Sequence, residues 1–249
     1  MKIISKKKIN LILIHGVGFN KKIWYFLKKK FNKKFKIYTI NLYLSKKKYN
    51  FNIDFKNFIK KIIYKIPKNS ILIGWSIGGL IATIINFKIK KNIILLITIC
   101  SSPCFKKKKK WPGINTDQIN KIKNELFYNY KNSIKNFLNL QKNNKNLKKI
   151  NILYKKIINK KKPNYNSLKF NIKILKKIDV RHLLKKIKTP ILRIYGNLDS
   201  IVPIKISKIL DSYLNQKSYI IKNSNHAPFI SHEKIFYNKI IKFIKKYIN

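Results

Sequence analysis

A single serine between two glycines is the first feature of this sequence that could do chemistry. Ser76 lies in the segment GWSIGG, where Gly74 and Gly78 flank it at two-residue spacing. The pattern G-x-S-x-G is typical of a strand that turns sharply into a helix and exposes a strained serine, whose small neighbours relieve the crowding. Ser76 is therefore our candidate nucleophile.

A serine hydroxyl needs a histidine to accept its proton, and the histidine needs an acid to orient it. Of the four histidines, His226 lies in the segment KNSNHAPF, directly after the last strand-like run, and we assign it as the base. We interpret His15 as an anchor for its own loop. His232 follows Ser231, which we expect to cap the final helix, and His182 precedes a strand at the opposite end of the sheet.

The acid that best completes the set is Asp199, in the segment YGNLDSIVP. It follows the strand-like run ILRIYG, and open α/β sheets collect their chemistry at the carboxyl ends of strands. The order Ser76, Asp199, His226 is the order of a catalytic triad in an α/β-hydrolase. We interpret the other six acids as surface charges: Asp54, Asp117, Glu125, Asp179, Asp211 and Glu233.

A turn after the first strand-like run supplies the remaining part of such a site. The segment LIHGVG, residues 13–18, ends in a His-Gly-x-Gly turn that lets backbone amides point at the nucleophile. We expect the amides of Val17 and of Ile77, which follows the serine, to form the oxyanion hole.

Strand-like and helix-like segments alternate along most of the chain. Alternation of this kind predicts a mostly parallel sheet with helices on both faces, and with the order of the site residues it predicts the α/β-hydrolase fold. The strand-like segments are INLILIHG, FKIYTINLY, SILIGWS, NIILLITICSS, TPILRIYG and KSYIIKN, and the helix-like ones are Trp24–Phe31, Phe55–Ile66, Ile77–Phe87 and Phe236–Ile248.

The alternation breaks between about Phe105 and His182, where no strand signal appears. The segments INKIKNELFYNYKNSIKNFLNL and NLKKINILYKKIINK instead place apolar residues three to four apart, as amphipathic helices do. We therefore expect a helical lid inserted between two strands. The core would comprise residues 1–105 and 183–249, and the lid residues 106–182.

The composition is strongly basic, with 59 lysines and arginines against seven acids and a formal net charge of +52. Such a charge is common in proteins that bind nucleic acids or membrane surfaces. Here lysine is spread over nearly every segment, and isoleucine and asparagine are abundant beside it, as AT-rich codon usage would produce across a whole proteome. We therefore interpret the charge as compositional and expect no nucleic-acid partner.

Two further features indicate the compartment. Cys100 and Cys104 are too few for a disulfide framework and lack a zinc-binding pattern, so we expect buried thiols in a reducing cytoplasm and no metal. The stretch from Asn69 to Phe87 has no charged residue and is nearly as long as a membrane span, but its glycines and serine favour a strand, turn and helix. We expect a cytoplasmic monomer without membrane contact or cofactor.

Longer segments carry a resemblance to one family. SSPCF, WPGI, FLNLQ, LRIYGNLDSIVP and NHAPFISH together resemble the pimeloyl-acyl-carrier-protein methyl ester esterases of biotin synthesis, from about Asn10 to the C-terminus. The resemblance implies an enzyme that removes the methyl group from the pimeloyl chain, releases methanol, and has an acyl carrier protein as partner.

The family's functional residues can be carried over to matching positions. The resemblance implies that Ser76 is the nucleophile, that Asp199 and His226 are its partners, and that Ile77 is an oxyanion amide. Val17 stands where the family has tryptophan, and the segment NLYLSKKKYN lacks the usual acidic, glycine-rich loop. The remaining implied contacts are an acyl channel at Phe137, Leu138, Asn139, Leu140 and Gln141, a substrate contact by His226, and carrier-protein contacts at Lys131, Lys135 and Lys149.

Two other functions remain open on the residues alone. Another serine hydrolase of the same fold, acting on small carboxylic esters, would share the triad and differ in the lid. A non-catalytic basic binding protein could keep a hydrolase shell. Hydrolysis of a short nitrophenyl ester separates the enzymes from the binding protein, and complementation of a biotin auxotroph separates the two enzymes.

Overall fold

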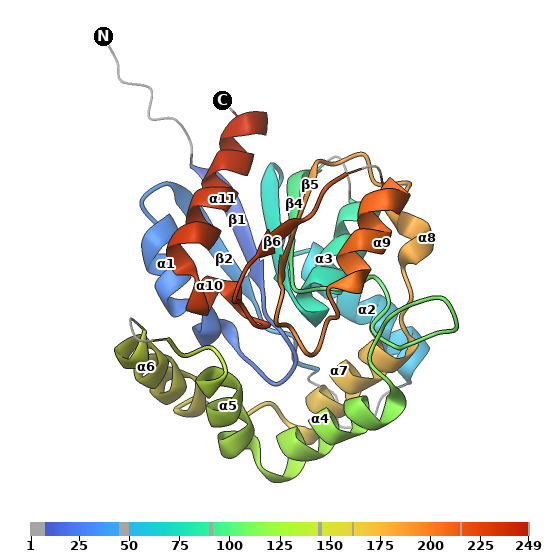
Figure 1. Ribbon diagram of the computed structural model, residues 1–249. Coiled ribbons are helices and arrows are strands. Elements are labelled where there is room, and N and C mark those ends of the chain that lie inside the picture. Colours follow the sequence, from blue (N-terminus) through green and yellow to red (C-terminus); the bar gives the residue numbers. More distant parts are fainter. Residues whose placement is uncertain are drawn as a thin grey trace.

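A six-stranded parallel sheet lies at the centre of the structure, with helices on both of its faces (Figure 1). The computed structural model describes residues 8–44, 50–89, 92–143, 146–160, 162–214 and 216–248. The basic N-terminal start at residues 1–7 and the lysine-rich part of NLYLSKKKYN at 45–49 therefore lie outside the described residues. The strands are β1 (Ile9–Ile14), β2 (Phe35–Ile40), β3 (Ser70–Trp75), β4 (Ile93–Ile99), β5 (Ile191–Gly196) and β6 (Tyr219–Ile221), and their order in the sheet is β2-β1-β3-β4-β5-β6.

The strand order reverses between β1 and β3, because the chain first builds outward to β2 and then returns to the other side of β1. In open α/β sheets, ligands bind at the carboxyl ends of the strands where this reversal occurs. The loops that follow β1 and β3 meet there, and these loops carry the oxyanion turn and the candidate nucleophile. The fold thus brings two of the predicted motifs to one point.

Alternate residues of the strands face two separate apolar cores. On β1, Leu11 and Leu13 pack toward α1 (Tyr25–Phe31) and α11 (Glu233–Tyr247), whereas Ile12 and Ile14 pack toward α2 (Phe51–Ile63), α3 (Ile77–Lys88) and α9 (Lys205–Leu214). Every residue of β3 is buried, which explains why this strand is a continuous apolar run in the sequence. Short elements complete the fold: the 3-10 helix η1 (Lys21–Trp24), α8 (Arg181–Leu184) and α10 (Pro228–Ser231).

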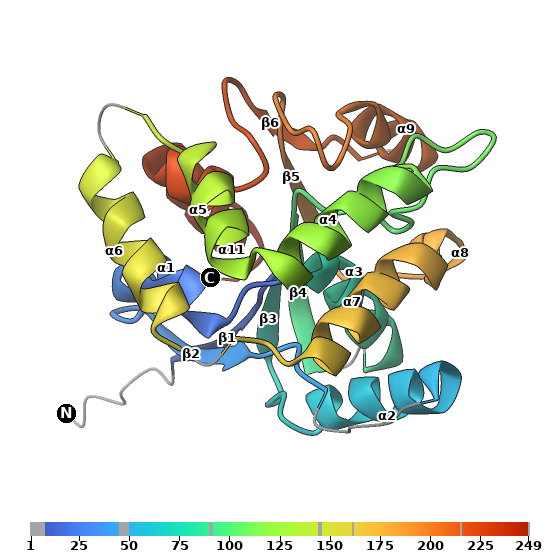
Figure 2. The same ribbon diagram turned by 90° about the horizontal axis from the view of Figure 1, so that it is seen from below.

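Helices fill the long interval between β4 and β5. They are α4 (Thr116–Tyr128), α5 (Tyr130–Asn139), α6 (Leu147–Ile158) and α7 (Tyr165–Lys177). Figure 2 views the structure from the end that they cover, with α4 lying across the strands between α5 and α7. Helices are therefore present in the interval where the sequence predicted them, and they lie over the end of the sheet seen in Figure 2. We refer to this interval as the insertion.

Two local expectations about helices and charges are wrong. Ser231 does not cap the final helix, because it ends α10, and His232 is the N-cap residue of α11 without a side-chain capping bond. Asp54 is not a surface charge: it is 4% exposed, and its carboxylate accepts a hydrogen bond from the Asn50 amide at 2.8 Å. A carboxylate one turn into a helix can accept a hydrogen bond from an N-terminal amide. This hydrogen bond offsets part of the cost of burying the Asp54 carboxylate.

The two ends of the insertion contact each other where the chain enters and leaves it. Cys104 and Asp179 form an antiparallel bridge, and the Val180 amide donates to the Pro103 carbonyl at 2.8 Å. The Asp179 carboxylate accepts hydrogen bonds from Arg181 Nε at 2.9 Å and Nη2 at 2.7 Å. We call this set of contacts the base clamp.

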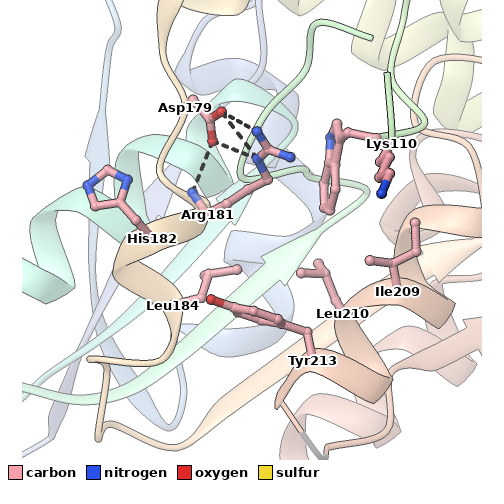
Figure 3. A pocket seen from close by; sticks show the side chains of 9 residues that line it. Lys110, Asp179, Arg181, His182, Leu184, Ile209, Leu210 and Tyr213 are labelled. Atoms are coloured by element: carbon pink, nitrogen blue, oxygen red, sulfur yellow. Dashed lines mark hydrogen bonds and ion pairs between the residues drawn. The ribbon is translucent and has the colours of Figure 1, made fainter. Parts of the chain in front are cut away.

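Two further side chains complete the base clamp. Lys108 Nζ donates to Asp179 at 2.6 Å, and the Arg181 guanidinium lies over the Trp111 ring, 5.1 Å from its centroid. Burial raises the pKa of Asp179, but the hydrogen bonds from Arg181 and Lys108 outweigh burial and hold that pKa well below its usual value. Trp111, Asp179 and Arg181 of the clamp line a cavity of about 470 Å³, and Leu210 and Tyr213 of α9 line it as well (Figure 3).

The base clamp predicts a stability effect that depends on shape and not on charge. Arg181→Lys keeps the positive charge but loses the planar fork and the stacking on Trp111. We expect the free energy of unfolding, measured by urea denaturation, to fall by about 1 kcal/mol. Lys186→Arg, at an exposed position of the same segment, is the control and should leave it unchanged. An Arg181→Lys protein as stable as the parent would contradict the clamp.

Candidate active site

Ser76 sits in a strained turn between β3 and α3. Its φ is 56°, in the left-handed region that residues with a side chain rarely adopt. Two contacts with the end of β4 hold the turn: the Ser76 amide donates to the Ile99 carbonyl at 2.9 Å, and Ser101 Oγ donates to the Ser76 carbonyl at 2.7 Å. The serine's conformation is therefore set by the neighbouring strand.

The glycines around Ser76 permit close backbone contact. A Cβ added to Gly74 would lie 2.3 Å from the Gly78 carbonyl oxygen, and one added to Gly78 would lie 2.3 Å from the Ile14 carbonyl oxygen. Backbone atoms cannot move aside as the end of a flexible side chain can. The spacing seen in the sequence thus reflects α3 starting directly against β1 and β3.

His226 and Asp199 form a buried pair beneath the insertion. His226 Nδ1 lies 2.7 Å from Asp199 Oδ2, and the Asp199 side chain is completely buried. The other carboxylate oxygen accepts hydrogen bonds from the amides of Ile201 at 2.8 Å and Val202 at 3.0 Å. All of these contacts orient the carboxylate, so Nδ1 of the imidazole carries the hydrogen and Nε2 remains available as an acceptor.

The backbone around His226 is also held in place. Trp75 Nε1 donates to the His226 carbonyl at 2.7 Å, and the amide of Ala227 donates to Gln141 Oε1 at 3.1 Å. The His226 ring packs against the rings of Trp75 and Phe137, at centroid distances of 5.6 and 6.1 Å. Trp75 of β3, Phe137 of α5 and Gln141 just after α5 thus position the histidine.

Ser76 and His226 line one cavity of about 320 Å³. Its buried lining residues include Phe19, Trp75 and Ser76, and we call this part its inner end. Its exposed lining residues are Glu125 on α4, Asn136 on α5 and Leu140 just after α5, and we call this part its outer end. The other lining residues are Gly16, Val17, Phe19, Trp75, Phe105, Ile122, Glu125, Leu126, Ser133, Ile134, Asn136, Phe137, Leu140, Leu175 and Ile201.

Of the two predicted oxyanion residues, Val17 lines the cavity, whereas Ile77 is not among its lining residues. Val17 is half-buried in the loop after β1 and lines the cavity. Ile77 is the first residue of α3, where a backbone amide has no acceptor within its own helix. His15 anchors the loop: its Nδ1 donates to the Gly16 carbonyl at 2.8 Å, and its Nε2 accepts from the Leu42 amide at 3.1 Å.

The five residues expected to form the acyl channel have different surroundings. Phe137 and Leu140 line the cavity, and Leu140 is 62% exposed at its outer end. Leu138 is buried in the apolar core, and Asn139 is exposed. Gln141 is buried and supports the histidine loop through Ala227 as described above.

Most of the cavity's apolar wall has no motif in the sequence. It comes from single residues of several elements, among them Phe19 after β1, Leu126 on α4 and Leu175 on α7. Ile122 and Leu126 are four residues apart, which places them on one face of α4, and this spacing was the one sequence signal that could have indicated part of the wall. Which helix covers which part of the sheet is a tertiary fact that spacing does not contain.

The three lysines expected to contact a carrier protein are not equivalent. Lys131 and Lys135 are exposed on α5. Lys149, on α6, makes an ion pair with Glu233 of α11 and lies over the Phe26 ring. Its ammonium group therefore already has a partner within the protein, whereas those of Lys131 and Lys135 face solvent.

One group of potential metal ligands lies in the site. Single ligand atoms of Cys100, Asp199 and His226 all fall within 4.8 Å of one another, and all three residues are buried. Burial, reinforced by the charge of Asp199, raises the pKa of the Cys100 thiol well above its usual value. His226 Nδ1 and Asp199 Oδ2 are already paired with each other by their 2.7 Å hydrogen bond. The group is therefore better described as the histidine–aspartate pair with a neutral thiol beside it.

Comparisons with known proteins identify the class to which this fold and site belong. A family model described as the alpha/beta hydrolase fold matches residues 9–233. Among solved structures, the esterase EaEST from Exiguobacterium antarcticum superimposes with a TM-score of 0.78 at 17% identity, covering 96% of this chain and 92% of that one. The likeness in structure supports the same fold.

Closer relatives specify the family. The pimeloyl-[acyl-carrier protein] methyl ester esterase of Wigglesworthia glossinidia brevipalpis is 43% identical over 99% of this chain and 97% of its own. The protein of the same name from Hamiltonella defensa is 32% identical over 97% of this chain and 95% of its own. The chain thus belongs to the alpha/beta hydrolases and, within them, to the pimeloyl-[acyl-carrier protein] methyl ester esterase family, which confirms the resemblance inferred from its motifs.

The uncharged stretch from Asn69 to Phe87 resolves into β3 and α3, as its glycines indicated. Across the described parts of the chain, no helix combines the length and the apolar character needed to cross a membrane. The free thiols of Cys100 and Cys104 are both buried, as expected.

The two hydrogen bonds of His15 predict a pH dependence of stability. Desolvation by burial lowers the pKa of His15 to about 4. Protonation of Nε2 would also remove the acceptor of the Leu42 amide. The unfolded chain takes up this proton near pH 6.5, so stability should fall by about 2–3 kcal/mol as the pH drops from about 6.5 to 4. His15→Asn should flatten this slope in urea titrations at several pH values. The exposed His182→Asn is the control; equal slopes in both variants would refute the assignment.

Proposed function

We propose that this chain hydrolyses the methyl ester of pimeloyl-acyl-carrier protein to pimeloyl-acyl-carrier protein and methanol, as its relatives are named to do. The observation that carries the proposal is a buried histidine–aspartate pair that shares an apolar cavity with a strained serine, in a chain 43% identical to such an esterase over nearly its whole length. We assign Ser76 as nucleophile, His226 as base and Asp199 as the acid that orients it.

The mechanism follows from the positions of these groups. His226 Nε2 accepts the Ser76 proton while Oγ attacks the ester carbonyl, and Asp199 stabilises the imidazolium that forms. The carbonyl oxygen becomes an oxyanion, which the amides of Val17 and Ile77 would stabilise. The imidazolium then gives its proton to the departing methoxide, so methanol leaves and an acyl-enzyme remains. Water, deprotonated by His226, attacks the acyl-enzyme and restores the serine.

The cavity suits a neutral ester at the end of a slim apolar chain. Its volume of about 320 Å³ is at the lower end of small-molecule sites. Its inner half is lined by Phe19, Trp75, Leu126 and Phe137, which offer an alkyl chain contact without hydrogen bonds. We propose that the chain lies along this wall with its methyl ester at Ser76.

We also propose that the helical insertion acts as a lid over this cavity. Residues 106–182 would form the lid, and residues 1–105 and 183–249 the hydrolase core that carries the catalytic groups. Support comes from the lining residues of α4, α5 and α7, which close the cavity on the side away from the sheet. The buried free thiols fit a reducing cytoplasm, where we place the reaction.

Complementation of a biotin auxotroph that lacks this esterase tests the proposed substrate. Expression of the parent chain should restore growth without biotin, and expression of the Ser76→Ala chain should not. Hydrolysis of short nitrophenyl esters without complementation would instead favour a general small-ester hydrolase. If the parent chain neither complements the auxotroph nor hydrolyses nitrophenyl esters, the non-catalytic binding protein is the remaining alternative.

The assignment of the triad predicts non-additive losses. Ser76→Ala, His226→Ala and the double variant should each lose a factor on the order of 10⁴ or more in kcat with a nitrophenyl ester, because the two groups act as one unit. Circular dichroism checks that the variants are folded. His182→Ala, which changes an exposed histidine, should keep full activity. Losses that multiply in the double variant would count against the shared role.

The carrier protein is acidic, and the exposed lysines on α5 predict how it is recognised. Steering between exposed charges is screened as the Debye length falls from about 10 Å at 0.1 M salt to about 3 Å at 1 M. We expect kcat/KM for the carrier-bound ester to fall steeply with salt, while that for a neutral short ester changes little.

Charge reversal locates this contact. The pair Lys131→Glu and Lys135→Glu should weaken hydrolysis of the carrier-bound ester about tenfold at low salt and leave the short ester unaffected. Lys56→Glu with Lys60→Glu, an exposed pair at the same spacing on α2, is the control. A silent reversal on α5, or equal effects of the two pairs, would mean that these lysines do not hold the carrier protein.

A further inference from the structure

Acidic residues are rare in this chain, and nearly all of them have an evident structural or catalytic place. Glu125 differs, because it lines the active-site cavity and its carboxylate has no ion pair or hydrogen bond with any residue that the structure describes. Four of the other six acids are paired with a basic residue: Asp199 with His226, Asp179 with Arg181, Asp211 with Arg193, and Glu233 with Lys149. Asp54 accepts a hydrogen bond from the Asn50 amide, and Asp117 lies in the first turn of α4.

Glu125 marks the outer end of the cavity. It is exposed on α4, as are Asn136 and Leu140 on the facing end of α5, whereas Phe19 and Trp75 at the inner end are at most 5% exposed. Leu126, the next residue, packs against Gly18 of the oxyanion loop. The helix therefore holds Glu125 between the solvent and the inner cavity that contains Ser76.

A carboxylate at this position opposes the field of the rest of the molecule. The net charge of +52 attracts anions to nearly every surface, and a cleft lined by one sign of charge concentrates ligands of the other sign. The proposed reaction converts a neutral methyl ester into a carboxylate at the inner end of the cavity. Without a local negative charge, carboxylate-ended chains, the product among them, would be held in the cavity.

We propose that Glu125 is a specificity-determining residue that admits acyl chains with a neutral leading end and disfavours those that lead with a carboxylate. This inference rests on the proposed function of the same site. The residue acts on the charge of the incoming chain end and takes no part in proton transfer. Glu125 places one unit charge several Å from the chain end, in a part of the cavity that is partly solvated. Repulsion at this distance corresponds to roughly a three- to tenfold weaker binding of a carboxylate-ended chain.

The test compares two inhibitors of equal length that differ in charge. Heptanoate and heptanamide are measured as competitive inhibitors of p-nitrophenyl butyrate hydrolysis, in the parent chain and in Glu125→Gln, at 0.05 M and 1 M salt. The control is Asp117→Asn, which removes the same charge from the same helix at a position that does not line the cavity.

Glu125→Gln should lower the inhibition constant of heptanoate roughly three- to tenfold at low salt and leave that of heptanamide unchanged, and 1 M salt should shrink the difference. Asp117→Asn should change neither constant. Equal changes for both inhibitors, no change for either, or the same effect from Asp117→Asn would overturn the proposal. Absence of ester hydrolysis in the parent chain would instead reject the proposed function. Loss of p-nitrophenyl butyrate hydrolysis in Ser76→Ala would confirm that the reporter reaction uses this site.

Discussion

The approach of α3 to the backbone of β1 and β3 is the constraint on which the rest of the site depends. Gly74 and Gly78 leave no room for a side chain, so the helix starts directly at the end of the strand and Ser76 is forced into the left-handed region. The same approach brings the first amide of α3 beside the loop after β1. The candidate nucleophile and the proposed oxyanion amides thus depend on one piece of backbone packing, which hydrogen bonds to Ile99 and Ser101 at the end of β4 support.

The meeting of the candidate site residues could be predicted because these residues lie at the ends of strands. Ser76, Asp199 and His226 follow β3, β5 and β6, and parallel strands bring such positions to one edge however far apart they are in the sequence. Strand ends are marked by short apolar runs and by glycines, which are local signals. The fold class followed from the same signals, since each strand and helix is long enough to show its own periodicity.

The parts that could not be predicted depend on which side chain faces which element. FLNLQ is one short segment, yet Phe137 and Leu140 reach the cavity, Leu138 faces the core and Gln141 bonds to the loop of the histidine. The orientation of α5 decides this, and α5 is placed by its contacts with α4 and α6. The ion pair of Lys149 with Glu233 was likewise not predictable, because Glu233 lies far away in the sequence.

The two arginines show what the composition of this chain preserves. Lysine provides nearly all of its positive charge, so a guanidinium persists only at two places. Arg193 is 4% exposed and donates to Ser218, Gln216 and Asp211, and Arg181 grips one carboxylate with two nitrogens while it covers Trp111. A flexible ammonium cannot reproduce several fixed donors in one plane. In a chain whose positive charge is almost all lysine, both arginines therefore mark places of rigid geometry, and such places can be located from the sequence.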